Sequence, residues 1–182
     1  MNRKKRKGDR LLFANLQKVA CPLFLLFLTA CGYQIAGRGG HIQSGVKTIA
    51  IPVFENKTME PIVEEEFTSA VLKGFIKDSR LEVVDRSQAD LVLDGIVTLY
   101  KESPLSFDQN QNALEYRMTI TTHLRLLQQS TKNVLWERDI TASSEYMVSS
   151  DVMSTRTAKL LALKEIAQNL AEEATDRVLW GW

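Results

Sequence analysis

Cysteine is scarce in this chain, which contains two in 182 residues, Cys21 and Cys31. From residue 32 onward there is no thiol, so neither a disulfide framework nor a cysteine-based metal site can form there. An exported domain without disulfides depends on its hydrophobic core for stability. The 152 residues that follow residue 30 are one domain's worth and are enough to bury a sizeable core.

Long hydrophobic runs are also missing. The apolar stretch "VACPLFLLFLTA" (19–30) holds twelve uncharged residues and contains Pro22, whereas spanning a bilayer takes about 20. The preceding segment is rich in Lys and Arg, as expected for an export signal with a basic start and a short apolar region. A basic nucleic-acid-binding arm is the alternative, but such an arm is not normally followed by "LFLLFL". Residues 1–30 are therefore predicted to be a signal peptide.

An excess of positive charge is absent once this segment is removed. Residues 1–30 hold seven of the 23 bases and one of the 22 acids, which leaves 16 bases and 21 acids, a net charge of −5. This balance excludes a bulk nucleic-acid binder.

Catalytic and metal-binding motifs are missing as well. There is no GxSxG, HExxH or P-loop pattern, and neither His41 nor His123 has another His or a Cys nearby in sequence. Both histidines are interpreted as surface residues. We expect no enzyme, no metal site and no cofactor.

The end of the apolar stretch has an unusual composition. Leu28-Thr29-Ala30-Cys31 resembles a bacterial lipobox, in which the cysteine is lipidated and becomes the mature N-terminus. A thiol is the most nucleophilic side chain for alkylation, and Thr29 and Ala30 are small enough for a membrane-surface peptidase. Bacterial lipoproteins usually carry three acyl chains, and more than one chain gives stable anchoring. Residues 31–45 contain several glycines and are predicted to be a flexible tether.

Hydrophobic periodicity predicts seven elements in the order β-α-β-β-β-β-α. They are expected as strands at 46–54, 81–85, 91–101, 114–126 and 134–148 and as helices at 61–78 and from about residue 150 onward. The clearest pattern lies in 114–126, where apolar and polar residues alternate and Thr122 is the one polar residue in the apolar register.

These elements predict an α+β fold: a two-layer sandwich with both helices on one face of a four- to five-stranded mixed sheet. Strands 46–54 and 81–85 should be joined by a right-handed crossover if they are parallel. The other face of the sheet is then expected to carry Thr119, Thr121, His123 and Arg125.

Several residues in and around the predicted strand 91–101 carry specific expectations. Leu99 is expected on the buried face with Leu91, and Gly95 is expected at a bulge or in close packing against a helix. Asp90 and Asp94 are interpreted as a strand-entry residue and a face residue. Residues 102–112, which include a proline, are predicted to form a polar loop.

Basic residues on the polar strand face and its turns are the candidate binding residues. They are Arg117, Arg125, Lys132 and Arg138. They either keep an exposed sheet soluble or form a patch for a phosphate-bearing ligand, which Arg and Lys bind through charge-assisted hydrogen bonds.

Near the end of the sequence lie Trp180 and Trp182. These indoles either pack on the domain or contact a partner or the membrane interface.

Four segments together resemble the LptE family of lipopolysaccharide-assembly lipoproteins. They are Cys31-Gly32-Tyr33, "IAIPVFENKTMEP" (49–61), "FTSAVLKGF" (67–75) and "RSQADLVLDGIV" (86–97). The resemblance covers nearly all of the chain after the signal and implies an LptE-like domain at 46–182. It implies a protein that plugs the outer-membrane β-barrel LptD in Gram-negative bacteria, helps that barrel assemble and takes part in delivering lipopolysaccharide. It also implies lipopolysaccharide binding through basic residues. Gly32 after the cysteine favours sorting to the outer membrane.

A second resemblance leaves an alternative open. "TIAIPVFEN" (48–56) followed by a helix is also similar to other periplasmic modules, including the curli-secretion lipoproteins, which oligomerise into their own pores. The length of the mature chain argues against them, because those proteins usually run longer. A lipid-anchored hydrolase is disfavoured because no catalytic set is present.

Overall fold

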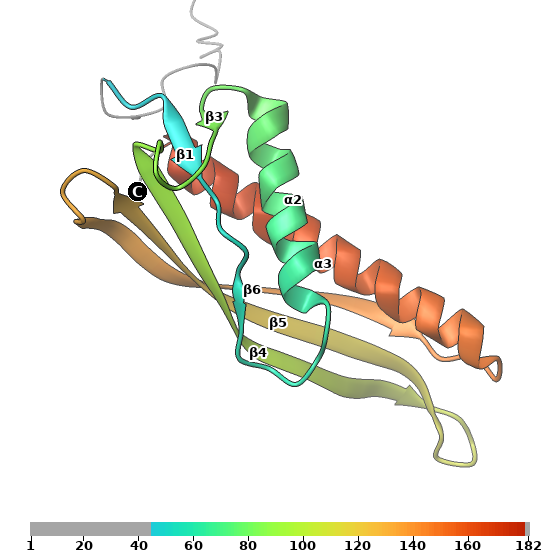
Figure 1. The fold of residues 1–182 in the computed structure, drawn as a ribbon. Coiled ribbons are helices and arrows are strands. Elements are labelled where there is room, and N and C mark those ends of the chain that lie inside the picture. The colour runs from blue at the N-terminus through green and yellow to red at the C-terminus, as the bar shows by residue number, and fades with distance from the viewer. Residues whose placement is uncertain (1–44, 181–182) are drawn as a thin grey trace, which may run out of the picture. The chain divides into compact units, whose positions relative to one another are not determined.

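The computed structural model describes residues 45–180, and the predicted signal peptide, Cys31 and Trp182 lie outside this range. Its sheet and helices are shown in Figure 1. The elements are β1 (Thr48–Ala50), β2 (Glu55–Asn56), α2 (Val63–Asp78), β3 (Glu82–Val83), β4 (Leu91–Phe107), β5 (Ala113–Gln128), β6 (Val134–Met147) and α3 (Val152–Trp180).

The sheet is mixed, as predicted. Its order is β3-β1-β4-β5-β6, with the short β2 also paired to β4. The pairs β1–β3, β1–β4 and β2–β4 are parallel, whereas β4–β5 and β5–β6 are antiparallel. Both helices cover one face of the sheet (Figure 1), with α2 packed against α3 and α3 packed against β6 and β5. The predicted α+β sandwich is confirmed, and β2 is the strand that the sequence pattern missed.

The helix α2 follows the spacing that predicted it. Val63, Phe67, Val71 and Phe75 are all buried against the sheet and α3. Three glutamates occupy its first turn, where negative charge is favoured by the helix dipole. The helix begins at Val63, two residues later than Pro61 suggested, because Ile62 adopts a left-handed conformation with φ 77°.

The strand β5 has one face buried from Met118 to Leu126, as its alternation predicted, whereas Leu114 at the start of the strand is exposed. Met118, Ile120, Leu124 and Leu126 are at most 2% exposed, and Thr122 shares their face at 1%. The partner helix α3 covers this face and buries its own apolar stripe, which includes Ile166, Leu170, Ala174 and Val178. Leu160, near the start of α3, is exposed.

The strand β4 corrects two predictions. A bulge lies between Val97 and Leu99, and it pairs Leu99 with Thr121 on the polar face instead of the buried face. The predicted loop at 102–112 is wrong over its first half, because β4 continues to Phe107. Its proline, Pro104, is tolerated because the parallel partners of β4 end at Val97, which leaves the later residues on a free edge.

Gly95 lies on the buried face of β4 with no bulge at its own position. A Cβ atom there would come within 2.6 Å of the Phe54 ring. The residue therefore provides space for close packing, as predicted. The predicted partner was wrong, because the ring comes from the segment before β2 and not from a helix. Leu93 and Val97 flank this contact and are fully buried.

Candidate functional site

The face of the sheet that the helices leave uncovered is called the open face here. It is built from cross-strand pairs between β5 and β6. Their side chains bond directly to one another: Arg117 Nη2 to Glu145 Oε1 (2.7 Å), Thr119 Oγ1 to Ser143 Oγ (2.8 Å), Thr121 Oγ1 to Thr141 Oγ1 (2.9 Å) and His123 Nδ1 to Asp139 Oδ1 (2.7 Å). The predicted placement of Thr119, Thr121, His123 and Arg125 on one face is confirmed.

One of these pairs joins opposite charges, and the other three involve hydroxyl groups or a histidine. Arg117 is neutralised by Glu145, and His123 contacts Asp139. Exposed pairs of this kind add little stability, about 0–1 kcal/mol each, but they leave few unpaired polar groups. The middle of the open face is therefore polar, and the Arg117–Glu145 pair is balanced in charge.

The four predicted basic residues do not form one patch. Arg138 is in register with Leu124, whose side chain is buried beneath the helices, so it projects to the opposite side from Arg125. Its predicted placement on the polar face is wrong, because residues 137 and 139 occupy that face in β6. Arg117 is on the open face, but three other open-face residues of β5, at positions 119, 121 and 123, separate it from Arg125.

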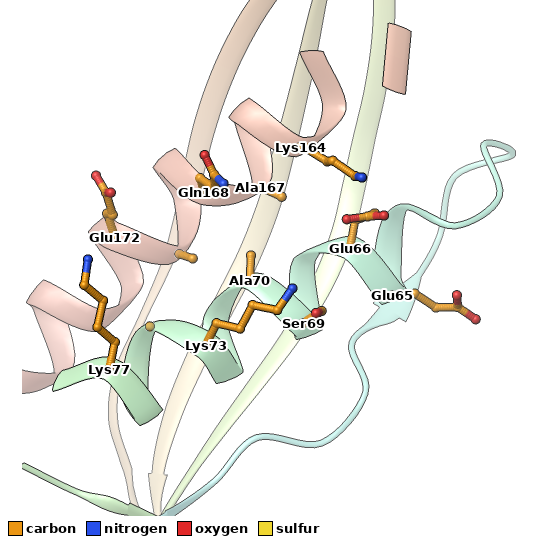
Figure 2. A pocket seen from close by; sticks show the side chains of 12 residues that line it. Glu65, Glu66, Ser69, Ala70, Lys73, Lys77, Lys164, Ala167, Gln168 and Glu172 are labelled. Carbon is orange, nitrogen blue, oxygen red and sulfur yellow. The ribbon is translucent and has the colours of Figure 1, made fainter. Parts of the chain in front are cut away.

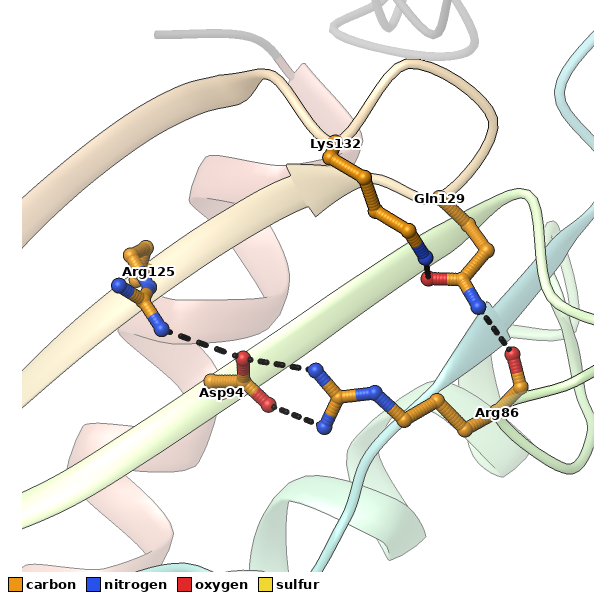
Figure 3. Close-up of polar contacts among 5 residues, drawn as sticks. All are labelled: Arg86, Asp94, Arg125, Gln129 and Lys132. Atoms are coloured by element: carbon orange, nitrogen blue, oxygen red, sulfur yellow. Dashed lines mark hydrogen bonds and ion pairs between the residues drawn. The ribbon is translucent and has the colours of Figure 1, made fainter.

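Arg125 and Lys132 do lie at the same end of the sheet, together with Arg86 (Figure 3). Asp94 on β4 accepts both arms of Arg86, with Nη1–Oδ1 at 3.1 Å and Nη2–Oδ2 at 3.3 Å, and its Oδ2 lies 3.6 Å from Arg125 Nη2. Lys132 Nζ donates to Gln129 Oε1 at 2.8 Å, and Gln129 Nε2 donates to the Arg86 carbonyl at 2.9 Å. We call Arg86, Arg125 and Lys132 the basic end.

The basic end has three cations and, among the described residues, one carboxylate within 4.0 Å of them, that of Asp94. Its three cations face Asp94 and Glu137, which lies opposite Arg125 in register. Among the described residues, Lys132 has no carboxylate within 4.0 Å. The side chains of Arg86 and Arg125 are about half exposed, at 54% and 45%. Guanidinium groups held in a fixed orientation and accessible to solvent suit a phosphate oxygen.

Sequence reasoning missed Arg86. It follows β3 in a loop, and only the parallel pairing of β3, β1 and β4 brings that loop beside Asp94. The alternation in β4 did place Asp94 correctly on a solvent face, and Asp90 directly precedes β4 as expected. Asp90 Oδ2 accepts hydrogen bonds from the Lys47 and Thr48 amides, which lower the pKa of its carboxyl.

A groove of about 720 Å³ runs along the outer seam between α2 and α3 (Figure 2). Small residues such as Ala70 and Gly74 let the helices approach each other there, and lysines and glutamates from both helices form the rim. Because both signs of charge line the rim, the groove does not select a charged ligand.

A polar cluster lies at the edge of the core, beneath the start of α3. Glu102 Oε1 accepts the hydroxyls of Tyr100 (2.9 Å) and Tyr146 (2.7 Å) and lies 3.4 Å from Lys159 Nζ. Lys159 also contacts Glu60 at 3.0 Å. Burial and then the Glu102 carboxylate raise the pKa of both tyrosines above their usual value. This cluster joins β4, β6, α3 and the loop before α2.

Two further properties hold for residues 45–180. They contain no cluster of three or more His, Cys, Asp or Glu side chains that could hold a metal ion. Within the same range, neither helix is both long and apolar enough to cross a bilayer.

The model of the lipopolysaccharide-assembly family LptE matches residues 46–179, from just before β1 almost to the end of α3. The chain belongs to the LptE family. Within this LptE-family domain, the "IAIPVFENKTMEP" segment has a structural role. Phe54 packs on Gly95, and the Asn56 amide donates to the Glu60 carbonyl (2.8 Å) and to Glu64 Oε2 (2.7 Å), which fixes the turn before α2.

Solved structures share the fold of this LptE-family chain at low sequence identity. Lipoprotein B from Nitrosomonas europaea is 12% identical, with a TM-score of 0.53 over 79% of this chain and 88% of its own. A hypothetical protein from Chlamydia trachomatis is 9% identical, with a TM-score of 0.51 over 73% and 98% of the two chains. PelC from Paraburkholderia phytofirmans, a dodecamer, is 16% identical, with a TM-score of 0.50 over 75% and 90%. No curated protein sequence matches the chain.

The most C-terminal described residue is Trp180. The Arg80 guanidinium lies 4.3 Å from the centroid of its ring, which is a cation–π contact, while the indole remains 43% exposed. The residue therefore packs on the domain through one face of its ring. The same prediction for Trp182 stays a prediction.

Proposed function

We propose that this LptE-family lipoprotein is anchored in the outer membrane by lipid on Cys31, plugs an LptD-type β-barrel and takes part in lipopolysaccharide delivery. The match of the family model to residues 46–179 carries the proposal. Residues 1–30 would be removed as a signal peptide, and residues 31–45 would connect the lipid to the domain. The role needs no catalytic group and no cofactor.

The open face gives this proposal a physical basis. A domain that sits in a water-filled lumen needs a polar surface without large apolar patches. The Thr and Ser hydroxyl pairs on β5 and β6 provide such a surface, because each hydroxyl has a neighbour to bond and both remain accessible to water. We therefore propose that the open face lines a wet interface with the barrel and helps it to assemble.

We propose the basic end as the place where lipopolysaccharide phosphates bind. Arg125 and Lys132 were candidates from the sequence, and the position of Arg86 beside them supports a shared ligand. Arg117 and Arg138 would be separate contacts. Arg117 lies farther along the open face, and Arg138 lies on the opposite side of the sheet.

The partnership is tested by isolating the tagged lipoprotein from outer membranes in mild detergent. We expect a stoichiometric, heat-modifiable β-barrel to copurify with it. A homo-oligomer without a barrel would instead support the self-assembling alternative, for which the dodecameric PelC gives a structural precedent at the level of fold. Substrate turnover with neither would point to an enzyme.

The anchor is tested separately with Cys31→Ala, which should leave a soluble or uncleaved precursor. Globomycin blocks lipoprotein signal cleavage, so treated cells should accumulate a slower-migrating form of the wild-type chain. An unchanged mobility, or an unmodified mature N-terminus found by mass spectrometry, would contradict lipidation.

The basic end is tested by reversing its charge with Arg125→Glu and Lys132→Glu together. Lipopolysaccharide binding should weaken about tenfold or more, because two charge-assisted contacts are lost. The matched control is Arg156→Glu with Lys164→Glu, which reverses one exposed Arg and one exposed Lys on α3. If both pairs weaken binding equally, or neither does while circular dichroism is unchanged, the basic end is not the binding site.

A further inference from the structure

The strand β6 forms one edge of the sheet and is long. It runs for 14 residues from Val134 to Met147 and pairs with β5 alone among the described residues. The opposite edge is formed by β3, which has two residues. Long edge strands expose unpaired backbone groups that another strand can bind.

The register identifies which amides of β6 point outward. Val148 N–H donates to the Leu114 carbonyl, so these two residues form a hydrogen-bonded pair. Such pairs alternate along an antiparallel ladder, so even-numbered residues of β6 bond to β5. Odd-numbered residues, from Glu137 to Glu145, direct their N–H and C=O groups away from the sheet.

Proline and lysine, two of the usual protections against strand addition, are missing from this edge, while its acidic side chains oppose a strand of like charge. The sequence of β6, "VLWERDITASSEYM", contains no proline, no glycine and no lysine. Its register irregularity lies at the start, opposite Leu126 and Leu127. The stretch with outward-pointing amides is therefore regular, and Asp139, Thr141, Ser143 and Glu145 within it are exposed.

The charge of this stretch selects the kind of strand that fits. The outward-directed residues include Glu137, Asp139 and Glu145 and no base, and the three carboxylate side chains are 59%, 66% and 46% exposed. A second copy of β6 would add three more acids and no compensating base on this face, and cross-strand pairs of like charge are unfavourable. Because Arg117 already pairs with Glu145, a strand with Lys or Arg opposite Glu137 and Asp139 would pair favourably with this stretch.

We propose that the outer edge of β6 binds an extended, basic segment of the barrel partner by strand addition. This inference rests on the proposed function. Because the strands of a closed barrel have no free edge, the segment belongs to a loop or terminus of the partner and not to its wall. The contact extends the sheet by one strand beyond β6 and leaves the basic end free.

Thr141→Pro tests the proposal. Proline removes the outward N–H of residue 141, and it is tolerated on an edge where the missing donor faced solvent. Thr141→Val is the matched control, because it also deletes the hydroxyl that bonds to Thr121 but keeps the amide. Copurification of the barrel from native outer membranes should fall about tenfold or more with Thr141→Pro and much less with Thr141→Val, which measures the contribution of the hydroxyl alone.

A second variant and a second measurement guard against misfolding. Ser143→Pro removes the next outward N–H on the same strand and should have the same effect if Thr141→Pro does not fold. In the wild-type complex, amide hydrogen exchange should slow at residues 139, 141 and 143 relative to the isolated domain. The neighbouring even-numbered amides are already bonded to β5 and should change little.

Three outcomes overturn the proposal. If the folded proline variant recovers as much barrel as wild type, the barrel partnership stands and strand addition fails. If proline instead abolishes a homodimer, the edge binds a second copy. If wild type recovers no barrel at all, the proposed function and this inference fail together.

Discussion

The two faces of β5 have opposite physical properties, although their residues alternate along one strand. Met118, Ile120 and Leu126 are fully buried under the helices, whereas Thr121 and Arg125 bond to neighbours on the open face. On the buried face, stability depends on filled volume. On the open face, exposed hydrogen bonds and ion pairs contribute little each. Substitutions on the open face can therefore alter binding without unfolding the domain, and those on the buried face cannot.

The largest effect is expected from Leu126→Ala on the buried face. The side chain is fully buried, so its truncation should cost about 2–5 kcal/mol of unfolding free energy through lost burial and a cavity. Urea unfolding followed by circular dichroism measures this change. A loss of unfolding free energy below about 1 kcal/mol would mean that the helices do not bury the Leu126 side chain.

The next effect is expected at Gly95, where the buried face of β4 has no room for a side chain. A Cβ atom within 2.6 Å of Phe54 forces the ring to move, so Gly95→Ala should cost about 1–3 kcal/mol. Phe54→Leu should reduce that cost, and a double-mutant cycle should show the coupling between the two sites. Additive effects would show that the ring does not pack against Gly95.

A third effect concerns the tyrosines that bond to Glu102 at the edge of the buried face. Their raised pKa means that the folded state keeps these protons more tightly than the unfolded state does. Their contribution to stability is complete below pH 10 and is lost as the pH rises above it, by up to about 1.4 kcal/mol per pH unit for each tyrosine. The unfolding free energy of the Tyr100→Phe, Tyr146→Phe double variant should therefore fall less steeply than that of wild type between pH 10 and 12. Equal slopes would exclude this contribution.

The smallest effect is expected from Thr121→Val on the open face. It removes one exposed hydroxyl pair with Thr141 and keeps the branched shape that suits a strand. The unfolding free energy should change by no more than about 0.5 kcal/mol. A loss as large as that of Leu126→Ala would show that the open face is not independent of the core.

The sequence predicts features that follow from local periodicity. The alternation in β5 identified both of its faces, and the four-residue spacing in α2 identified its buried stripe. The order of the elements and the placement of both helices on one face followed from these patterns.

Features that depend on distant residues could not be predicted. The bulge beside Thr98 moves Leu99 to the open face, and nothing in that local sequence requires it. The extension of β4 past Pro104 depends on the missing neighbour at that edge. Arg86 joins the candidate site through the parallel pairing of β3, β1 and β4, which no local pattern specifies.

The parallel pairing of β1 with β4 also has a consequence for how the chain matures. Thr48 and Asp90, which join these strands, are 42 residues apart, whereas β4, β5 and β6 are consecutive neighbours. When the chain emerges N-terminus first, β1 and α2 appear well before β4, the strand with which β1 pairs. Contacts between distant residues form slowly and leave apolar surface exposed meanwhile. The early half of the domain is consequently the half that would benefit most from a chaperone before the domain is complete.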